Sequence, residues 1–231
     1  MQVESYVSDR LRLPELFEIP FRELLPYIVL ILIMFLGFGF RYHNHAFMSF
    51  DHDEMGLVSK SKGILILGFP YTKFGDQIRW LTTYEAVPYP LALVGFLFGY
   101  SEWSMRLPSV IFGTMTIGVL GLMGRRLFNW RTGLFVALIY ACLPLNIRWG
   151  QNAFYPSQCQ FMATLTFYLF YEAIRARPFN RRVLTAATVT FCLAYLSWEG
   201  TGFMLPALFI GLAVLAAMTK SDLGTAQGLR P

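Results

Sequence analysis

The sequence predicts an all-α polytopic membrane protein with about six transmembrane helices and a long first extracytoplasmic loop that carries interfacial helices. Of the 231 residues, 55% are hydrophobic and 14% are charged, and the mean hydropathy is +0.48; this balance is typical of integral membrane proteins. The five tryptophans lie near the ends of apolar runs, where indole rings favour the membrane interface. No stripe of basic residues and exposed aromatics is present, so we do not expect a nucleic-acid partner.

The chain begins with a polar, proline-containing stretch. We expect residues 1–24 to form a cytoplasmic arm with a short amphipathic piece on the bilayer. The first transmembrane helix is expected over residues 25–40. This apolar run is short for a hydrocarbon layer that needs about 20 residues. Tyr27, Arg41 and Tyr42 are therefore expected to extend the helix into the interface.

The stretch from residue 41 to residue 106 has a different composition. It is charged and rich in glycine and proline, and its apolar pieces, residues 63–71 and 88–100, are too short to cross a bilayer. The sequence therefore predicts one long outer loop with helices that lie at the membrane surface.

Five further apolar runs complete the predicted bundle. Pro108 is expected to open the second span at the first helical position, where proline is tolerated. Glycines at 113, 118, 121 and 124 would let neighbouring helices approach closely. Pro144 is expected to kink the third span. The five spans are expected over residues 107–124, 132–146, 158–173, 183–198 and 201–218.

Two arginine-rich turns predict the orientation of the bundle. Residues 125–131 and 175–182 contain several arginines and no acidic residue, and the positive-inside rule places such turns in the cytoplasm. Six spans then leave both termini cytoplasmic, with a membrane module over residues 25–219 and a polar tail over residues 220–231. We expect a multi-pass protein of the inner (plasma) membrane.

This orientation gathers polar side chains on the outer face. The densest group is the acidic cluster at residues 50–55, and Arg148, Asn152, Tyr155 and Glu199 follow in later connections. An acidic cluster can bind a divalent cation, accept a proton from a hydroxyl or simply solvate a turn, and the solvated turn is the commonest case. A carboxylate between two apolar helices, as at Glu199, is costly unless a cavity or a cation accompanies it.

Two further functions are open for these side chains. A guanidinium at the outer boundary can neutralise a departing phosphate, or it can contact lipid phosphate without any role in catalysis, and both apply to Arg148. His43 and His45, followed by Asp51, His52 and Asp53, contain the ligand types of a divalent metal site. A His-x-His pair at a helix end is, however, more often interfacial.

Several short motifs, in this order and spacing, resemble a known enzyme family. The chain is similar over roughly residues 25–215 to the GT-C glycosyltransferases, specifically the family 39 dolichyl-phosphate-mannose protein mannosyltransferases and the aminoarabinose transferases. The resemblance covers the N-terminal part of these longer proteins. It is carried by Asp53-Glu54, Pro88-Tyr89-Pro90-Leu91, Leu97-Phe98-Gly99-Tyr100-Ser101-Glu102, Arg106-Leu107-Pro108-Ser109, Gly124-Arg125-Arg126-Leu127-Phe128, Leu143-Pro144, Gln151-Asn152-Ala153 with Tyr155, and Trp198-Glu199-Gly200 before Leu205-Pro206.

The resemblance implies an enzyme that moves a sugar from a polyprenyl-phosphate donor to a lipid or protein acceptor on the extracytoplasmic face, with inversion. It implies that Asp53, with Glu54 beside it, is the catalytic base or a metal-linked carboxylate. If a metal is bound, we expect His52, from the cluster itself, to be a second ligand. The family often has a lysine before the proline pair, where this chain has Ala86-Val87. The phosphate contact is therefore either missing or supplied by Arg148 or Arg79.

Two other functions compete with this one. A truncated relative could keep the fold without catalysis, as a scaffold subunit that binds partner membrane proteins. A transporter is less consistent with the sequence, because no pair of interrupted helices repeats between the two halves and no span carries an acid at mid-membrane.

Overall fold

The computed structural model describes residues 21–74, 77–80, 83–176, 180–211 and 213. The expected tail and most of the expected arm lie outside the described residues, as do residues 212 and 214–218 of the expected sixth span. Inside the described part, helices occupy the positions of the first five predicted spans, so the helical membrane fold predicted from composition and hydropathy is confirmed.

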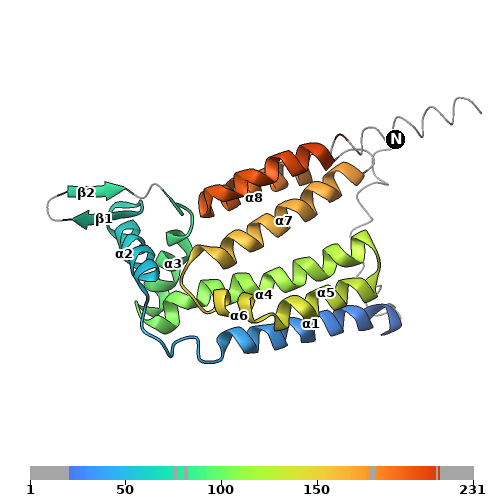
Figure 1. Cartoon of the computed structure of the whole chain (residues 1–231), viewed down its shortest axis with the longest axis horizontal. Helices are drawn as coiled ribbons and strands as arrows, with labels where there is room; N and C mark the ends of the chain where they lie inside the picture. Colours follow the sequence, from blue (N-terminus) through green and yellow to red (C-terminus); the bar gives the residue numbers. More distant parts are fainter. Residues whose placement is uncertain (1–20, 75–76, 81–82, 177–179, 212, 214–231) are drawn as a thin grey trace, which may run out of the picture.

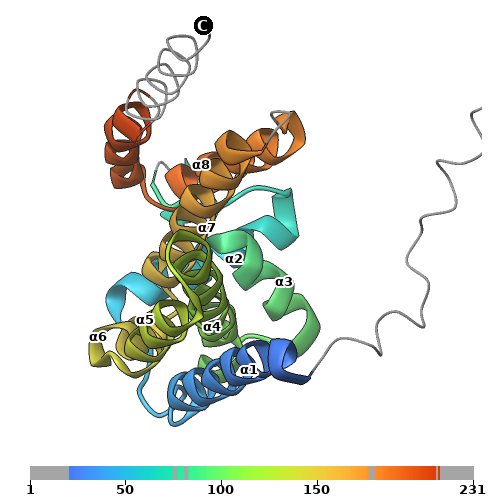
Figure 2. The same cartoon turned by 90° about the vertical axis from the view of Figure 1, so that its right-hand side faces the viewer.

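The helices form a bundle with the long loop and the α6–α7 connection at one end and the α4–α5 turn at the other (Figure 1). Figure 2 looks along the bundle and shows α4 in the middle, where it contacts α1, α5 and α7. Helix α8 packs on the far side of α7. The bundle helices are α1 (Phe21–Tyr42), α4 (Glu102–Leu127), α5 (Trp130–Cys142), α6 (Pro144–Gly150), α7 (Tyr155–Arg175) and α8 (Arg181–Ser197).

The sequence predicted that the second span begins at Pro108, but helix α4 begins earlier, at Glu102. Ser101 and Ser104 form a reciprocal capping box, in which each side chain accepts a hydrogen bond from the other residue's backbone N–H. This cap starts the helix at Glu102 and leaves Pro108 inside it. The expectation that Pro108 opens the span is therefore wrong, and the helix tolerates the loss of one backbone hydrogen bond there.

Helices α5 and α6 form one bent unit. Their axes differ by 64° across the break at Leu143-Pro144, which confirms the predicted kink. The carbonyl groups of Tyr140 and Ala141, at the end of α5, accept hydrogen bonds from the Arg41 guanidinium at 3.3 Å each. The first helix extends through Arg41 to Tyr42, as expected, but Arg41 is completely buried against α5; its depth in the membrane stays a prediction.

Small residues bring α4 close to its neighbours, as expected. An added Cβ at Gly121 would lie 2.5 Å from a methyl group of Leu30 on α1. An added Cβ at Gly124 would lie 2.8 Å from the Cα of Gly133 on α5. Both distances are too short for a real contact, so the absence of side chains at Gly121 and Gly124 is what allows these helices to meet.

The long loop folds onto the end of the bundle. It contains α2 (His52–Leu67) and α3 (Pro88–Phe98), which confirms the expectation of helices in this segment. Between them lies an antiparallel hairpin of β1 (Tyr71–Phe74) and β2 (Gln77–Trp80), which the sequence did not predict. A short 3₁₀ helix (Glu199–Phe203) follows α8 and replaces the expected two-residue hinge.

Among the described helices, α1 and α4 are long and apolar enough to cross a membrane, and the bent α5–α6 pair qualifies as a third span. The number six, the membrane concerned and the side on which the termini lie stay predictions.

Candidate functional site

The acidic cluster forms the first turn of α2. The Asp51 carboxylate accepts a hydrogen bond from the backbone N–H of Glu54 at 2.8 Å, and the Glu54 carboxylate accepts one from the backbone N–H of Asp51 at 3.1 Å. This capping box satisfies two N–H groups that a helix start leaves free. The cluster is therefore a helix N-terminus and not a solvated turn.

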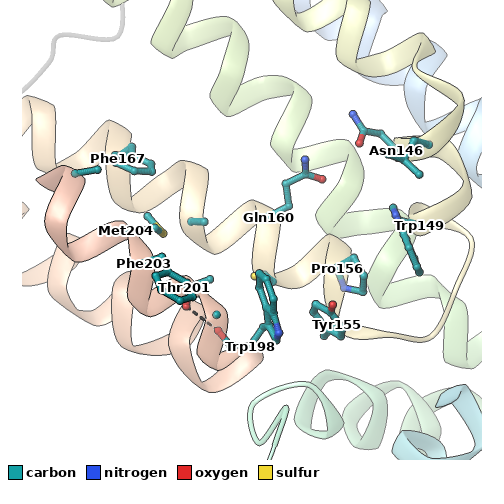
Figure 3. Close-up of a pocket in the computed structure, with 15 residues that line it drawn as sticks. Asn146, Trp149, Tyr155, Pro156, Gln160, Phe167, Trp198, Thr201, Phe203 and Met204 are labelled. Carbon is teal, nitrogen blue, oxygen red and sulfur yellow. Dashed lines mark hydrogen bonds between the residues drawn. The ribbon is translucent and has the colours of Figure 1, made fainter.

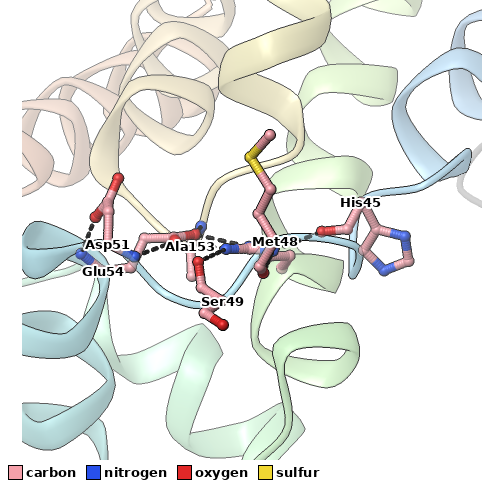
Figure 4. A network of polar contacts seen from close by, with 7 residues as sticks. His45, Met48, Ser49, Asp51, Glu54 and Ala153 are labelled. Carbon is pink, nitrogen blue, oxygen red and sulfur yellow. Dashed lines mark hydrogen bonds and ion pairs between the residues drawn. The ribbon is translucent and has the colours of Figure 1, made fainter.

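Glu54 forms a buried ion pair with Arg106 of α4 (Figure 4). The Nε and Nη2 groups of Arg106 donate to the two carboxylate oxygens at 2.8 and 2.6 Å. The backbone N–H of Ala153 also donates to Oε1, at 2.6 Å. With the contact from Asp51, four hydrogen bonds occupy the carboxylate, which matches the number of lone-pair sites it offers.

Arg106 extends the network to the segment between α1 and α2. Its Nη1 group donates to the carbonyl oxygens of His45 at 2.8 Å and Met48 at 2.7 Å, and its Nη2 group donates to that of Ser49 at 3.2 Å. One guanidinium and one carboxylate thus hold together the starts of α2 and α4, the segment after α1 and the segment before α7.

These contacts keep Glu54 ionised. Burial by itself would raise the pKa of the Glu54 carboxyl, but the hydrogen bonds from Arg106, Ala153 and Asp51 outweigh it and hold the pKa below its ordinary value. A carboxylate with a low pKa and no free lone pair is a poor proton acceptor. The geometry of Glu54 therefore favours a positioning role, and the expected catalytic role stays a prediction.

Asp53 has different surroundings although it is the adjacent residue. It is exposed, it takes no part in the capping box, and no hydrogen bond ties it to another described residue. It lies near enough to Tyr155, at the start of α7, for the two side chains to interact electrostatically. Of the two neighbouring carboxylates, Asp53 is the one that is free to take part in a reaction.

A hollow of about 580 Å³ opens between the segment after α1 and the end of α6. We call it the charged hollow. The guanidinium of Arg148 is exposed and has no hydrogen-bond partner among the described residues, whereas Glu54 and Arg106 are fully engaged. The hollow is lined by Asn44, His45, Phe47, Met48, Ser49, Asp51, Glu54, Arg106, Arg148, Gln151 and Asn152.

A second hollow, of about 660 Å³, lies on the other side of α6 (Figure 3). We call it the aromatic hollow. It follows α7 from Tyr155 to Phe167 and is closed on its far side by Trp198, Phe203 and Met204. The remaining lining residues are Leu145, Asn146, Trp149, Pro156, Cys159, Gln160, Ala163, Gly200, Thr201 and Ala207. None of these lining residues is charged, so the hollow suits an apolar or neutral ligand.

Stacked rings form the end of the aromatic hollow at the start of α7. Tyr155 stacks on Tyr84 with ring centroids 4.6 Å apart and on Trp198 with centroids 5.6 Å apart. Tyr84 adopts a left-handed backbone conformation, with φ of 58°, which is uncommon for a bulky residue. The stack joins the long loop, α7 and the end of α8 at the place where Asp53 approaches.

The comparisons with known proteins identify the family. Residues 86–226 match the dolichyl-phosphate-mannose-protein mannosyltransferase family. The chain belongs to this family. The match includes most of the chain and confirms the resemblance carried by the motifs; the protein is thus a relative of membrane glycosyltransferases of the GT-C type. No curated protein matches the chain.

The match covers the whole aromatic hollow but begins at Ala86, after the acidic cluster. Arg106, which lies within the match, contacts Glu54, which lies outside it. The mannosyltransferase-like part of the chain is thus joined to the acidic cluster by the buried ion pair.

The structure brings only some of the expected site residues together. Arg148 and Asn152 line the charged hollow, and Tyr155 lines the aromatic hollow. Asp53 and Glu199 line neither hollow, and both are exposed. Arg79 lies in β2, where it pairs with Thr72 across the hairpin. The expected single cavity is therefore two hollows separated by α6, with Asp53 near the end of one of them.

Three polar residues of these hollows were missed by sequence reasoning. Arg106 was quoted only as part of a motif, although an arginine at the start of an apolar span is itself a functional signal. Asn146 and Gln160 fall inside predicted spans, where an isolated amide side chain gives the same signal more weakly.

Metal binding was tested on the residues expected to provide it. His52 and Asp53 are adjacent on the first turn of α2, and both are exposed. Within the described residues there is no group of three or more His, Cys, Asp or Glu side chains that could hold a metal ion. The two side chains alone do not form a metal site, and we derive no step through a metal.

Proposed function

We propose that this chain transfers a sugar from a polyprenyl-phosphate carrier to a lipid or protein hydroxyl at the extracytoplasmic face. The observation that carries the proposal is the position of Asp53: a free carboxylate on the first turn of α2, which Glu54 ties to Ala153 just before α7, where Tyr155 begins a hollow within the mannosyltransferase-like part of the chain. A family whose members use dolichyl-phosphate-mannose as donor supports the choice of carrier.

The shape of the aromatic hollow supports a lipid-linked substrate. Its apolar lining continues along α7 to Phe167, so it can accommodate hydrocarbon, and its end at the start of α7 carries aromatic rings. Its volume of about 660 Å³ is within the range of small-molecule sites.

Asp53 serves as general base in this proposal. Its carboxylate takes the proton of the acceptor hydroxyl while the hydroxyl oxygen bonds to the anomeric carbon of the sugar. The bond between that carbon and the carrier phosphate breaks, and the phosphate leaves with the electron pair. A single displacement of this kind inverts the configuration of the anomeric carbon.

Arg148 is the cation we assign to the departing phosphate. Its guanidinium has no partner among the described residues and stands at the edge of the charged hollow. A planar guanidinium can bind two phosphate oxygens at once, and positive charge stabilises the negative charge that develops there. Glu54 and Arg106 hold the segments on which Asp53 and Arg148 lie.

The test is release of the carrier by purified protein in lipid nanodiscs. The protein is incubated with a panel of polyprenyl-phosphate sugars and simple hydroxyl acceptors, and the free polyprenyl phosphate is measured. Release that depends on one sugar and on the acceptor supports the proposal. Binding of the carrier without release from any donor would instead support the scaffold function.

A further inference from the structure

One wall of the aromatic hollow carries an amide that is open to a ligand. Asn146 is 9% exposed as a residue, lies in the first turn of α6 and lines the hollow. Its amide makes no hydrogen bond to any other described residue, and it is not among the buried polar atoms that lack a partner. The amide therefore faces the space of the hollow, where it can donate to and accept from a ligand.

Gln160 and Trp149 add donors to the same wall. The hydroxyl of Tyr140 donates to Oε1 of Gln160 at 2.7 Å, which leaves the Gln160 amide N–H groups free. The indole N–H of Trp149 also has no partner among the described residues. Figure 3 shows Asn146, Trp149 and Gln160 around one space, with no hydrogen bond between them. Several N–H donors that line one hollow are thus available to a ligand.

The other residues of the aromatic hollow indicate which kind of ligand oxygen these N–H groups bind. No charged side chain lines the aromatic hollow, so nothing there offsets the charge of a phosphate. Amides can donate to and accept from neutral hydroxyl groups. The rings of Trp149, Tyr155 and Trp198 provide flat apolar faces, which suit the C–H face of a pyranose ring.

We infer that Asn146, Trp149 and Gln160 form the binding site for the sugar ring of the lipid-linked donor. The amides bind ring hydroxyls, and the neighbouring aromatic rings pack against the apolar face of the sugar. This site deepens the proposed function and rests on it for the identity of the carrier. It also explains why two amides and an indole N–H lie within an otherwise apolar wall.

Equilibrium binding to the full chain in nanodiscs tests this site. The two probes are bare polyprenyl phosphate and the same carrier bearing a hexose, so that only the sugar differs. The variants are Asn146→Leu, which keeps the branched shape of the side chain and removes the amide, and Trp149→Phe, which keeps a ring and removes the N–H. The control is Thr164→Val on α7, whose hydroxyl bonds only the carbonyl of Gln160 and which does not line the hollow.

The wild-type protein should bind the hexose-bearing carrier about fivefold to tenfold more tightly than the bare carrier, the increment expected of one or two buried neutral hydrogen bonds. Both variants should reduce this preference to about twofold or less without changing the affinity for the bare carrier. Thr164→Val should keep the wild-type preference.

Two results would overturn the assignment. One is an equal loss of affinity for both carriers, which would mean that the amides hold the phosphate or the fold. The other is an unchanged preference in both variants. If the wild-type protein binds neither carrier, the proposed function fails, and octyl glycosides of common hexoses decide the sugar site. Binding of an octyl glycoside that Asn146→Leu abolishes supports the site, and its absence rejects it.

Discussion

Two neighbouring carboxylates of α2 have opposite roles in this structure. Glu54 is 1% exposed, paired with Arg106 and fully hydrogen-bonded, whereas Asp53 is exposed and free of hydrogen bonds to the described residues. The sequence predicted that this cluster matters. It could not separate the two side chains, because the difference depends on a residue 52 positions away on another helix.

Replacement of Asp53 by asparagine tests the free carboxylate. Asp53→Asn keeps the size of the side chain but removes the proton acceptor, so it should lower turnover about a hundredfold or more. Expression should stay normal, because Asp53 makes no contact in the capping box. The matched control is Glu85→Gln, which removes an exposed carboxylate of the same loop and should leave turnover unchanged. Wild-type turnover in Asp53→Asn would reject the assignment.

The Glu54–Arg106 pair predicts that the stability of the segment between α1 and α2 depends on pH. The folded structure holds the pKa of Glu54 below its ordinary value, so the network contributes stability above the ordinary glutamate pKa of about 4.3. That contribution is lost as the pH falls through the lower pKa of the folded state. Proteolysis of residues 43–51 should therefore be slow at neutral pH and accelerate only below about pH 4.

The comparison for this experiment is Glu54→Gln. It leaves the Arg106 charge buried and unpaired, a loss of about 3–5 kcal/mol, so residues 43–51 should be cleaved readily at every pH. Wild-type protection in Glu54→Gln, or protection of the wild-type protein that does not change with acid, would show that the ion pair does not hold the segment.

At the scale of the helices and strands, the sequence predicted those features that depend on local composition. The positions of the helices followed from hydropathy, and the kink followed from Pro144. The hairpin was missed, since its strands have four residues each and strands this short carry little pattern. The buried position of Arg41 was missed because its partners are carbonyl groups freed by a break in α5–α6.

The close approach of α4 and α5 leads to a prediction about stability. A methyl group at Gly124 would meet the backbone of Gly133 at 2.8 Å, and a backbone cannot move aside as a side chain does. Gly124→Ala should therefore separate the helices and lower stability by about 1–3 kcal/mol, measured as a lower midpoint of thermal unfolding in detergent.

The matched control is Gly39→Ala on α1, where an added Cβ meets nothing within 4 Å. There alanine should be neutral or stabilising by about 0.5–1 kcal/mol, because alanine loses less backbone freedom than glycine when the helix folds. Equal effects of Gly124→Ala and Gly39→Ala would show that the close contact does not limit stability.

At the scale of the whole molecule, the site is a product of tertiary folding. The long loop, α4, α6, α7 and the end of α8 meet at one end of the bundle (Figure 1). The sequence predicted that these connections share a face from the alternation of arginine turns. It could not predict that α6 divides the space into a charged and an aromatic hollow, because both hollows depend on the angle at which α6 leaves α5.

The central claim is that Asp53 lies at an outward-facing site for a lipid-linked sugar. The most direct measurement uses single cysteines at positions 53 and 199, after Cys142, Cys159 and Cys192 are replaced by alanine. A membrane-impermeant thiol reagent is added to oriented vesicles, with and without a polyprenyl-phosphate sugar. We predict that both positions react from the outside and that the donor protects position 53. Reaction of position 53 only from the cytoplasmic side, or equal reaction with and without every donor tested, would contradict the account.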